Sequence, residues 1–121
     1  MIARNAPFLL AATSLLAACA TPVSYTDAPM KRFDKDTEYA VEERPGGYSV
    51  TINYSRYQFI PESSAVATAC RQALTAVAHD IADQRLRKIR PINEQRIRLS
   101  MGRNGMTGIT SCSATAPVEY E

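Results

Sequence analysis

The stretch QRIRLSMGRNGMTGITSCSAT (residues 95–115) decides the fold. Apolar and polar residues alternate on both sides of Asn104 and Gly105, which is typical of strands with one buried face. Asn followed by Gly favours a two-residue type I′ turn, because both central residues of that turn need a positive φ. We therefore predict a hairpin around this pair, in which Ile97 lies opposite Cys112 on the apolar face.

An amphipathic helix is predicted before this hairpin. Pro61 opens it, Ser63 or Ser64 is in position to cap its first turn, and the pattern continues to about Leu86. Apolar residues recur at spacings of three and four, as expected for one buried helix face: Val66, Cys70, Ala73, Leu74, Val77 and Ile81. This face is expected to pack on the sheet.

A second hairpin is predicted before the helix, because residues 39–54 alternate on both sides of a break at residues 45–47. Tyr57 and Phe59 then have the opposite parity, so we expect a bulge near Ser55. The order strand, strand, helix, strand, strand predicts an α+β fold. It would form a single small domain, a mainly antiparallel four-stranded sheet with one helix packed on one face.

The first eighteen residues have the composition of an export signal. Arg4 is their only charged residue, and residues 8–18 form an apolar run. A membrane-spanning helix needs about 20 apolar residues, so this run is too short to cross a bilayer. We interpret residues 1–18 as a signal peptide.

This signal ends in Leu16, Ala17, Ala18 and Cys19, which resembles the lipobox of bacterial lipoproteins. The resemblance implies that the Cys19 thiol receives a diacylglycerol, that the chain is cut before Cys19, and that the new amine is acylated, for example with palmitate. It also implies sorting to the outer membrane, facing the periplasm, because Ala20 stands where the family's inner-membrane retention signal has Asp. The alternative is ordinary secretion, with cleavage before Thr21.

Three regions follow from these patterns. Residues 1–18 are the signal peptide, residues 19–36 are the lipid anchor and a flexible linker, and residues 37–118 are the α+β domain. The linker is expected because its prolines, small polar residues and alternating charges show neither a strand nor a helix period. Such a linker would hold the domain some tens of ångströms from the bilayer.

With Cys19 assigned to the lipid, Cys70 and Cys112 remain. Export places them in an oxidising compartment, and both are expected between helix and sheet, so a disulfide is predicted. The alternative is a pair of buried thiols too far apart to bond.

Charge suggests a binding surface. The mature chain would carry 13 basic and 12 acidic residues, because the signal removes only Arg4. Alternation places Arg96 and Arg98 on the open face of the sheet, and Arg56 with Tyr57 forms a second candidate on the aromatic strand. The expected partner is an envelope protein or an anionic envelope component, whereas nucleic acid is excluded by the compartment. The alternative is a solvated surface that resists edge-to-edge pairing.

Catalytic and metal sites have little support. His79 is the only histidine, and with Asp83 it supplies too few ligands for a metal. We expect no cofactor. The sequence predicts a membrane-tethered, non-enzymatic binding or structural module. The alternative is a small envelope enzyme such as a hydrolase, which would need a pocket where titratable side chains converge.

Overall fold

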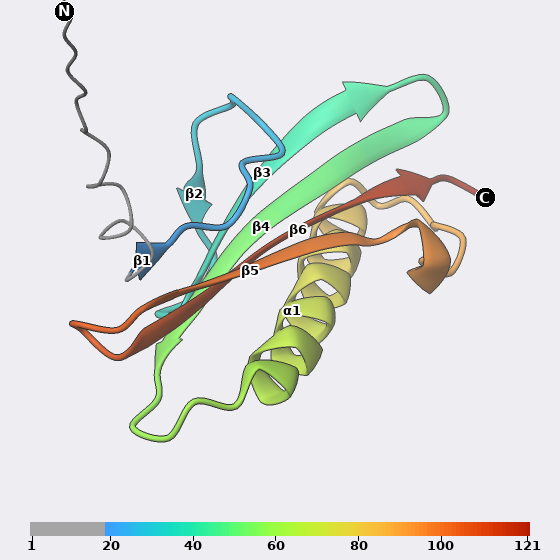
Figure 1. The fold of residues 1–121 in the computed structure, drawn as a ribbon. Coiled ribbons are helices and arrows are strands. Elements are labelled where there is room, and N and C mark those ends of the chain that lie inside the picture. Colours follow the sequence, from blue (N-terminus) through green and yellow to red (C-terminus); the bar gives the residue numbers. More distant parts are fainter. Residues whose placement is uncertain (1–18) are drawn as a thin grey trace, which may run out of the picture.

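One helix packs on one face of an antiparallel sheet in this computed structural model, which describes residues 19–121 (Figure 1). The predicted signal peptide lies outside the described residues. The predicted α+β class, with its single helix and antiparallel sheet, is confirmed. The elements are β1 (Cys19–Ala20), β2 (Lys31–Arg32), β3 (Thr37–Arg44), β4 (Gly47–Tyr57), α1 (Ser63–Gln84), the 3₁₀ turn η2 (Glu94–Arg96), β5 (Arg98–Asn104) and β6 (Ile109–Glu119).

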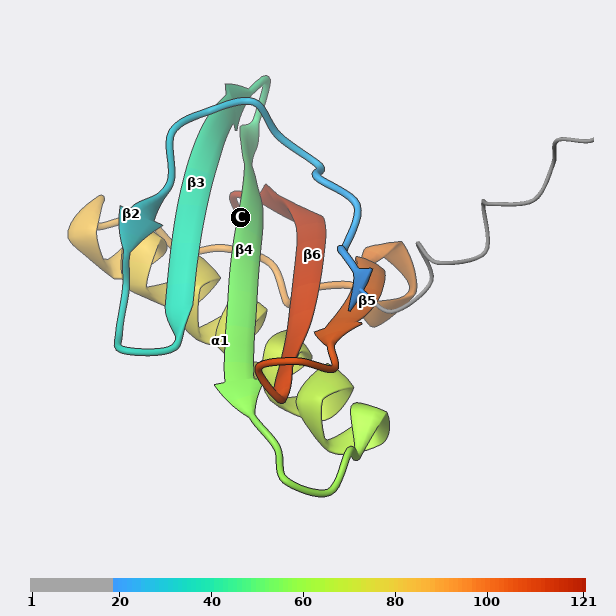
Figure 2. The ribbon, with the colours of Figure 1, turned by 60° about the vertical axis from the view of Figure 1, so that its left-hand side comes forward.

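The sheet has the strand order β1-β5-β6-β4-β3-β2 and six strands rather than the predicted four. The four long strands are the predicted ones, and the two additional strands are two-residue segments at the two edges. Helix α1 covers one face, as Figures 1 and 2 show from two sides. The opposite face, which the helix leaves uncovered, is called the open face below.

The core lies between α1 and the two central strands. The helix buries the predicted apolar face against alternate residues of β4 and β6, among them Tyr48, Val50, Ile52, Ala114 and Ala116. The predicted capping by Ser63 or Ser64 is wrong, because the helix begins one residue after Glu62, whose side chain makes no capping hydrogen bond. Instead, the Gln58 side-chain oxygen accepts the Glu62 backbone N–H at 3.1 Å.

The β5–β6 hairpin has a different register from the predicted one. Its loop has four residues, because Asn104 pairs with Ile109 and Met101 pairs with Cys112. The backbone N–H of Gly108 donates to the Asn104 carbonyl at 2.9 Å, and the Asn104 side chain accepts the Met106 N–H at 2.9 Å. These bonds favour the longer loop over a two-residue turn. The shift is four residues, an even number, so Cys112 still lies on the predicted face.

The predicted bulge near Ser55 is also wrong. Strand β4 pairs with β6 without interruption from Gly47 to Tyr57. Tyr57 therefore lies on the open face, and Phe59 lies beyond the end of the strand; both are exposed. The change of parity marks the end of burial rather than a distortion of the strand.

Residues 21–30, here called the strap, cross the open face from the β5 edge to the β3 edge (Figure 2). The Val23 N–H donates to the Ser100 hydroxyl at 2.9 Å, and the Thr26 hydroxyl donates to the Glu42 carboxylate at 2.7 Å. The expectation of a free linker over residues 19–36 is therefore corrected, because this segment contributes β1, the strap and β2 to the fold.

The fold also extends beyond residue 118 at its other end. Tyr120 forms an isolated bridge with Ile89, and the Arg90 N–H donates to the Glu119 carbonyl at 2.8 Å. The segment after α1 is thereby fixed to the end of β6.

Candidate functional site

Cys70 and Cys112 form a disulfide, as predicted. Their α-carbons lie 6.3 Å apart, and the bond joins α1 to β6 across the core. Both residues are buried, so the bond is a structural one that links the helix layer to the sheet layer.

The four residues predicted as a binding surface lie in two separate places. Arg98 lies on the open face at the start of β5, and Arg96 precedes it in η2. Arg56 and Tyr57 lie at the end of β4. Arg98 pairs with Thr115, which in turn pairs with Thr51 of β4. Thr51 precedes Tyr57 by six residues along this strand, so the two places are about 20 Å apart.

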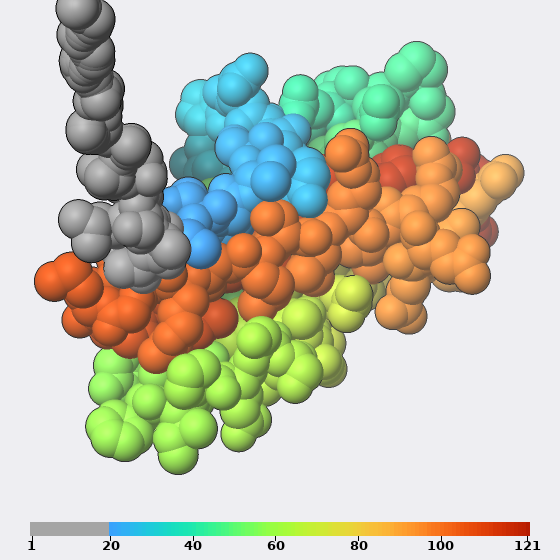
Figure 3. Space-filling model, viewed as in Figure 1, coloured from blue at the N-terminus to red at the C-terminus, as the bar shows by residue number. Residues whose placement is uncertain are grey.

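A hollow of about 650 Å³ opens on this face between the strap and the sheet. We call it the open-face hollow. Figure 3 shows the strap, in blue, lying across the face beside the orange segment that contains β5. The lining of the open-face hollow includes both predicted arginines and residues of β3, β4, β6 and the strap. The lining residues are Tyr25, Glu42, Glu43, Arg44, Ser49, Gln95, Arg96, Arg98, Thr115, Ala116 and Pro117.

Arg96 and Arg98 are held only loosely in this hollow, whereas Arg44 donates to the Ser49 hydroxyl at 2.9 Å. The Arg98 guanidinium lies 5.2 Å from the centre of the Tyr25 ring, within the range of a cation–π interaction. The Arg96 guanidinium lies 3.9 Å from the Glu119 carboxylate, and both side chains are more than half exposed. Exposed pairs of this kind contribute at most about 1 kcal/mol. Both guanidinium groups therefore remain able to bind an anion.

The carboxylates of the hollow are engaged by the protein. Glu42 accepts the Thr26 hydroxyl on the open face. Glu43 lies opposite Tyr48, so its side chain is on the helix side of the sheet, where it forms a two-bond ion pair with Arg85 at the end of α1. The hydrogen bonds from Arg85 hold the pKa of Glu43 below its usual value. Because Arg44, Arg96 and Arg98 outnumber them, the lining carries a positive excess.

Sequence reasoning missed the strap and β3 side of this hollow. Tyr25 lies in the segment predicted to be a linker, and Glu42 and Arg44 were not among the predicted site residues. The sequence signal for a packed strap was weak, because it consists of one alternation, Val23 and Tyr25 on either side of a polar residue, in an otherwise polar segment.

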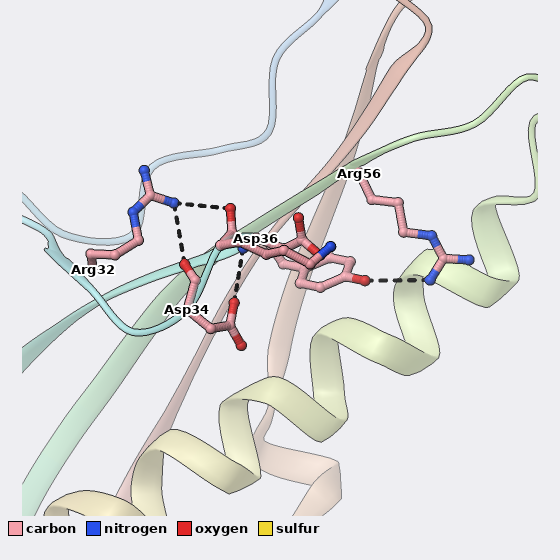
Figure 4. Close-up of polar contacts among 6 residues, drawn as sticks. Arg32, Asp34, Asp36 and Arg56 are labelled. Atoms are coloured by element: carbon pink, nitrogen blue, oxygen red, sulfur yellow. Dashed lines mark hydrogen bonds and ion pairs between the residues drawn. The ribbon is translucent and has the colours of Figure 1, made fainter.

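The second half of the predicted surface is partly engaged. Arg56 donates to the Tyr54 hydroxyl at 3.4 Å, a contact that raises the pKa of Arg56 (Figure 4). In the same view, Arg32 donates to the backbone carbonyls of Asp34 and Lys35. Tyr57 is 63 % exposed, and its ring lies over Gly108.

A cluster at the carboxyl end of α1 has a structural role. Arg85 donates to Glu43 and, at 3.0 Å, to the Tyr120 hydroxyl, and its guanidinium lies 4.8 Å from the centre of the Tyr48 ring. The buried Tyr48 hydroxyl donates to the Ala78 carbonyl at 2.8 Å, and burial raises the pKa of Tyr48 to about 12. These contacts fix the end of the helix to β3 and to the chain terminus.

Within residues 19–121, no three His, Cys, Asp or Glu side chains are placed to hold a metal ion together. The same part of the chain contains no helix with the length and apolar character needed to cross a membrane. His79 and Asp83 are exposed on α1.

Comparison of the chain with family models, curated proteins and solved structures finds no match.

Proposed function

We propose that this protein is a lipoprotein of the bacterial envelope, tethered to the outer membrane through acyl chains on Cys19 and facing the periplasm. The observation that carries the tether is the sequence Leu16–Cys19, whose last residue also belongs to β1. Cleavage before Cys19 would leave every described element in place. The disulfide agrees with export, because such bonds persist in oxidising compartments.

The tether is tested by comparing the parent with Cys19→Ser, with Ala20→Ser as a control that keeps the cysteine. We expect acyl mass on the parent and the control, and recovery of both with the membrane fraction. Cys19→Ser should carry no acyl mass and leave that fraction, since acyl chains supply the membrane affinity. A parent without acyl mass, or a Cys19→Ser chain that fractionates like the parent, would contradict the tether.

We further propose that the domain is a non-enzymatic module that binds an anionic envelope component, or an acidic segment of an envelope protein, at the open-face hollow. Arg44, Arg96 and Arg98 suit this role, because guanidinium groups bind phosphate and carboxylate with two parallel hydrogen bonds. The alternative, a small hydrolase, would need a free acid–base pair. That alternative is less favoured, because Glu42 and Glu43 are each bonded to a partner.

Binding is tested by titrating the folded chain with inorganic phosphate and with glucose 1-phosphate while amide chemical shifts are followed. We expect shifts around the open-face hollow and affinity about tenfold weaker in Arg98→Gln, the cost of one charged hydrogen bond. Arg71→Gln is the matched control, because Arg71 is exposed on α1. Equal affinities in the two variants would contradict the assignment, and turnover of the sugar phosphate would favour the enzyme.

A further inference from the structure

Exposed apolar side chains gather at one end of the molecule. Within residues 19–121, seven large apolar side chains are exposed, and five of them belong to the end of β4, the loop after it, and the β5–β6 loop region. We call these five the anchor-end patch: Tyr57, Phe59, Ile60, Met106 and Ile109. Phe59 and Met106 are 84 % and 88 % exposed. Contiguous exposed apolar groups indicate an interaction site, whereas single ones do not.

The two loops that carry the patch are joined by direct contacts. Tyr57 pairs with Ile109, and the Gln58 N–H donates to the Gly108 carbonyl at 2.8 Å. The Arg103 guanidinium donates to the carbonyls of Gln58 and Gly108. The patch is therefore held as one surface.

Cys19 lies in the same row of the sheet as this patch. Cys19 pairs with Asn104, Asn104 with Ile109, and Ile109 with Tyr57. Neighbouring strands lie about 4.8 Å apart, so the α-carbons of Cys19 and Tyr57 are separated by about 15 Å. Because β1 begins at Cys19, no length of free chain separates the predicted attachment point from the fold.

We propose that the anchor-end patch inserts into the interface between headgroups and acyl chains of the bilayer that holds Cys19. This inference rests on the proposed acylation of Cys19. Acyl chains attached at this row draw the end of the domain against the membrane, and the apolar side chains of the anchor-end patch then face lipid. Aromatic and aliphatic side chains bury at this depth in proteins that lie on membranes.

Apolar contact, rather than charge, drives this docking. Arg56 precedes Tyr57 in β4 and points to the opposite face of the sheet, and Asp36 and Glu62 lie close enough to Arg56 to act on its charge. The surface is therefore mixed in charge, and docking should depend little on the fraction of anionic lipid. The open-face hollow, about 20 Å along the sheet, remains clear of the headgroups and accessible from the periplasm.

The chain contains no tryptophan, so a single introduced tryptophan reports its own surroundings. The test uses lipidated Phe59→Trp in vesicles of phosphatidylethanolamine with phosphatidylglycerol and brominated acyl chains. Leu86→Trp is the matched control: Leu86 is 91 % exposed and lies just beyond α1, a helix about 33 Å long that starts near the patch. Met106→Trp is a second reporter in case Phe59→Trp fails to fold.

We expect a blue-shifted emission for Phe59→Trp and quenching by brominated lipid several-fold stronger than for Leu86→Trp. Equal quenching of the two, with acyl mass present on Cys19, would overturn the docking while leaving the tether intact. A parent without acyl mass would remove the tether and this inference together. The double variant Cys19→Ser with Phe59→Trp tests self-association, because it keeps the reporter and lacks the predicted acyl site. A blue shift of its emission that grows with protein concentration in the absence of vesicles would assign the patch to a second copy and overturn its docking on the bilayer.

Discussion

The ionisation of Tyr48 is coupled to folding. Its hydroxyl is buried and donates to the Ala78 carbonyl, so Tyr48→Phe should lower the free energy of unfolding at pH 7 by about 1 kcal/mol. Burial raises the pKa of Tyr48 from 10 to about 12 in the folded state. The stability that the neutral phenol contributes is therefore complete below pH 10 and is lost as pH rises through about 12.

The measurement is urea denaturation of the parent and Tyr48→Phe at pH 7 and at about pH 11. The difference in unfolding free energy between the two should shrink at the higher pH. Tyr57→Phe, at an exposed position, is the control and should follow the parent at both values. A difference that stays constant would contradict the coupling.

Among the elements, the strap packs closely against Gly102 of β5, where there is no room for a side chain. A β-carbon added to Gly102 would lie 2.5 Å from the Ala20 carbonyl oxygen and 2.7 Å from Cδ of Pro22. Gly102→Ala should therefore displace the strap while β5 and β6 remain paired. We expect faster amide exchange and proteolysis in residues 20–30 with little change in the unfolding midpoint.

Ser111→Ala is the control for the strap, because Ser111 pairs with Gly102 on the neighbouring strand and the change adds no volume. Its exchange and cleavage should match those of the parent. If the strap is as well protected from amide exchange and proteolysis in Gly102→Ala as in Ser111→Ala, the strap is not held by its contact with Gly102.

Element types could be predicted from periodicity, but pairing could not. Alternation identified the four long strands, and the spacing of Val66, Cys70, Leu74 and Val77 identified α1 and its buried face. The register of the last hairpin was wrong, because hydrogen bonds of the Asn104 side chain and carbonyl favour a longer loop than the Asn-Gly pair suggests. The disulfide was still predictable, because face depends on parity alone.

The candidate site depends on the whole molecule, which explains why only part of it could be predicted. Arg98 was identified from alternation alone. Tyr25, which forms a wall of the open-face hollow, could not be identified in this way, because the strap crosses the sheet without the period of a strand. It is held by single hydrogen bonds to Ser100 and Glu42, and such contacts between distant segments have no local signature in the sequence.

The disulfide ties the two layers of the molecule together and makes its stability depend on the compartment. The bonded residues are 42 positions apart, so the bond should contribute roughly 4 kcal/mol, a large part of a small domain's total. In the presence of a reductant, we expect the free energy of unfolding measured in urea to fall by that amount, and the unfolding midpoint to move to a lower urea concentration. Cys70→Ala with Cys112→Ala should show the same loss in the absence of reductant and no further change with it. A loss below about 1 kcal/mol would mean that the core alone stabilises the fold. The expected loss would instead make the reduced chain much less stable than the oxidised one, and under the proposed export the stable fold would form only in the oxidising compartment.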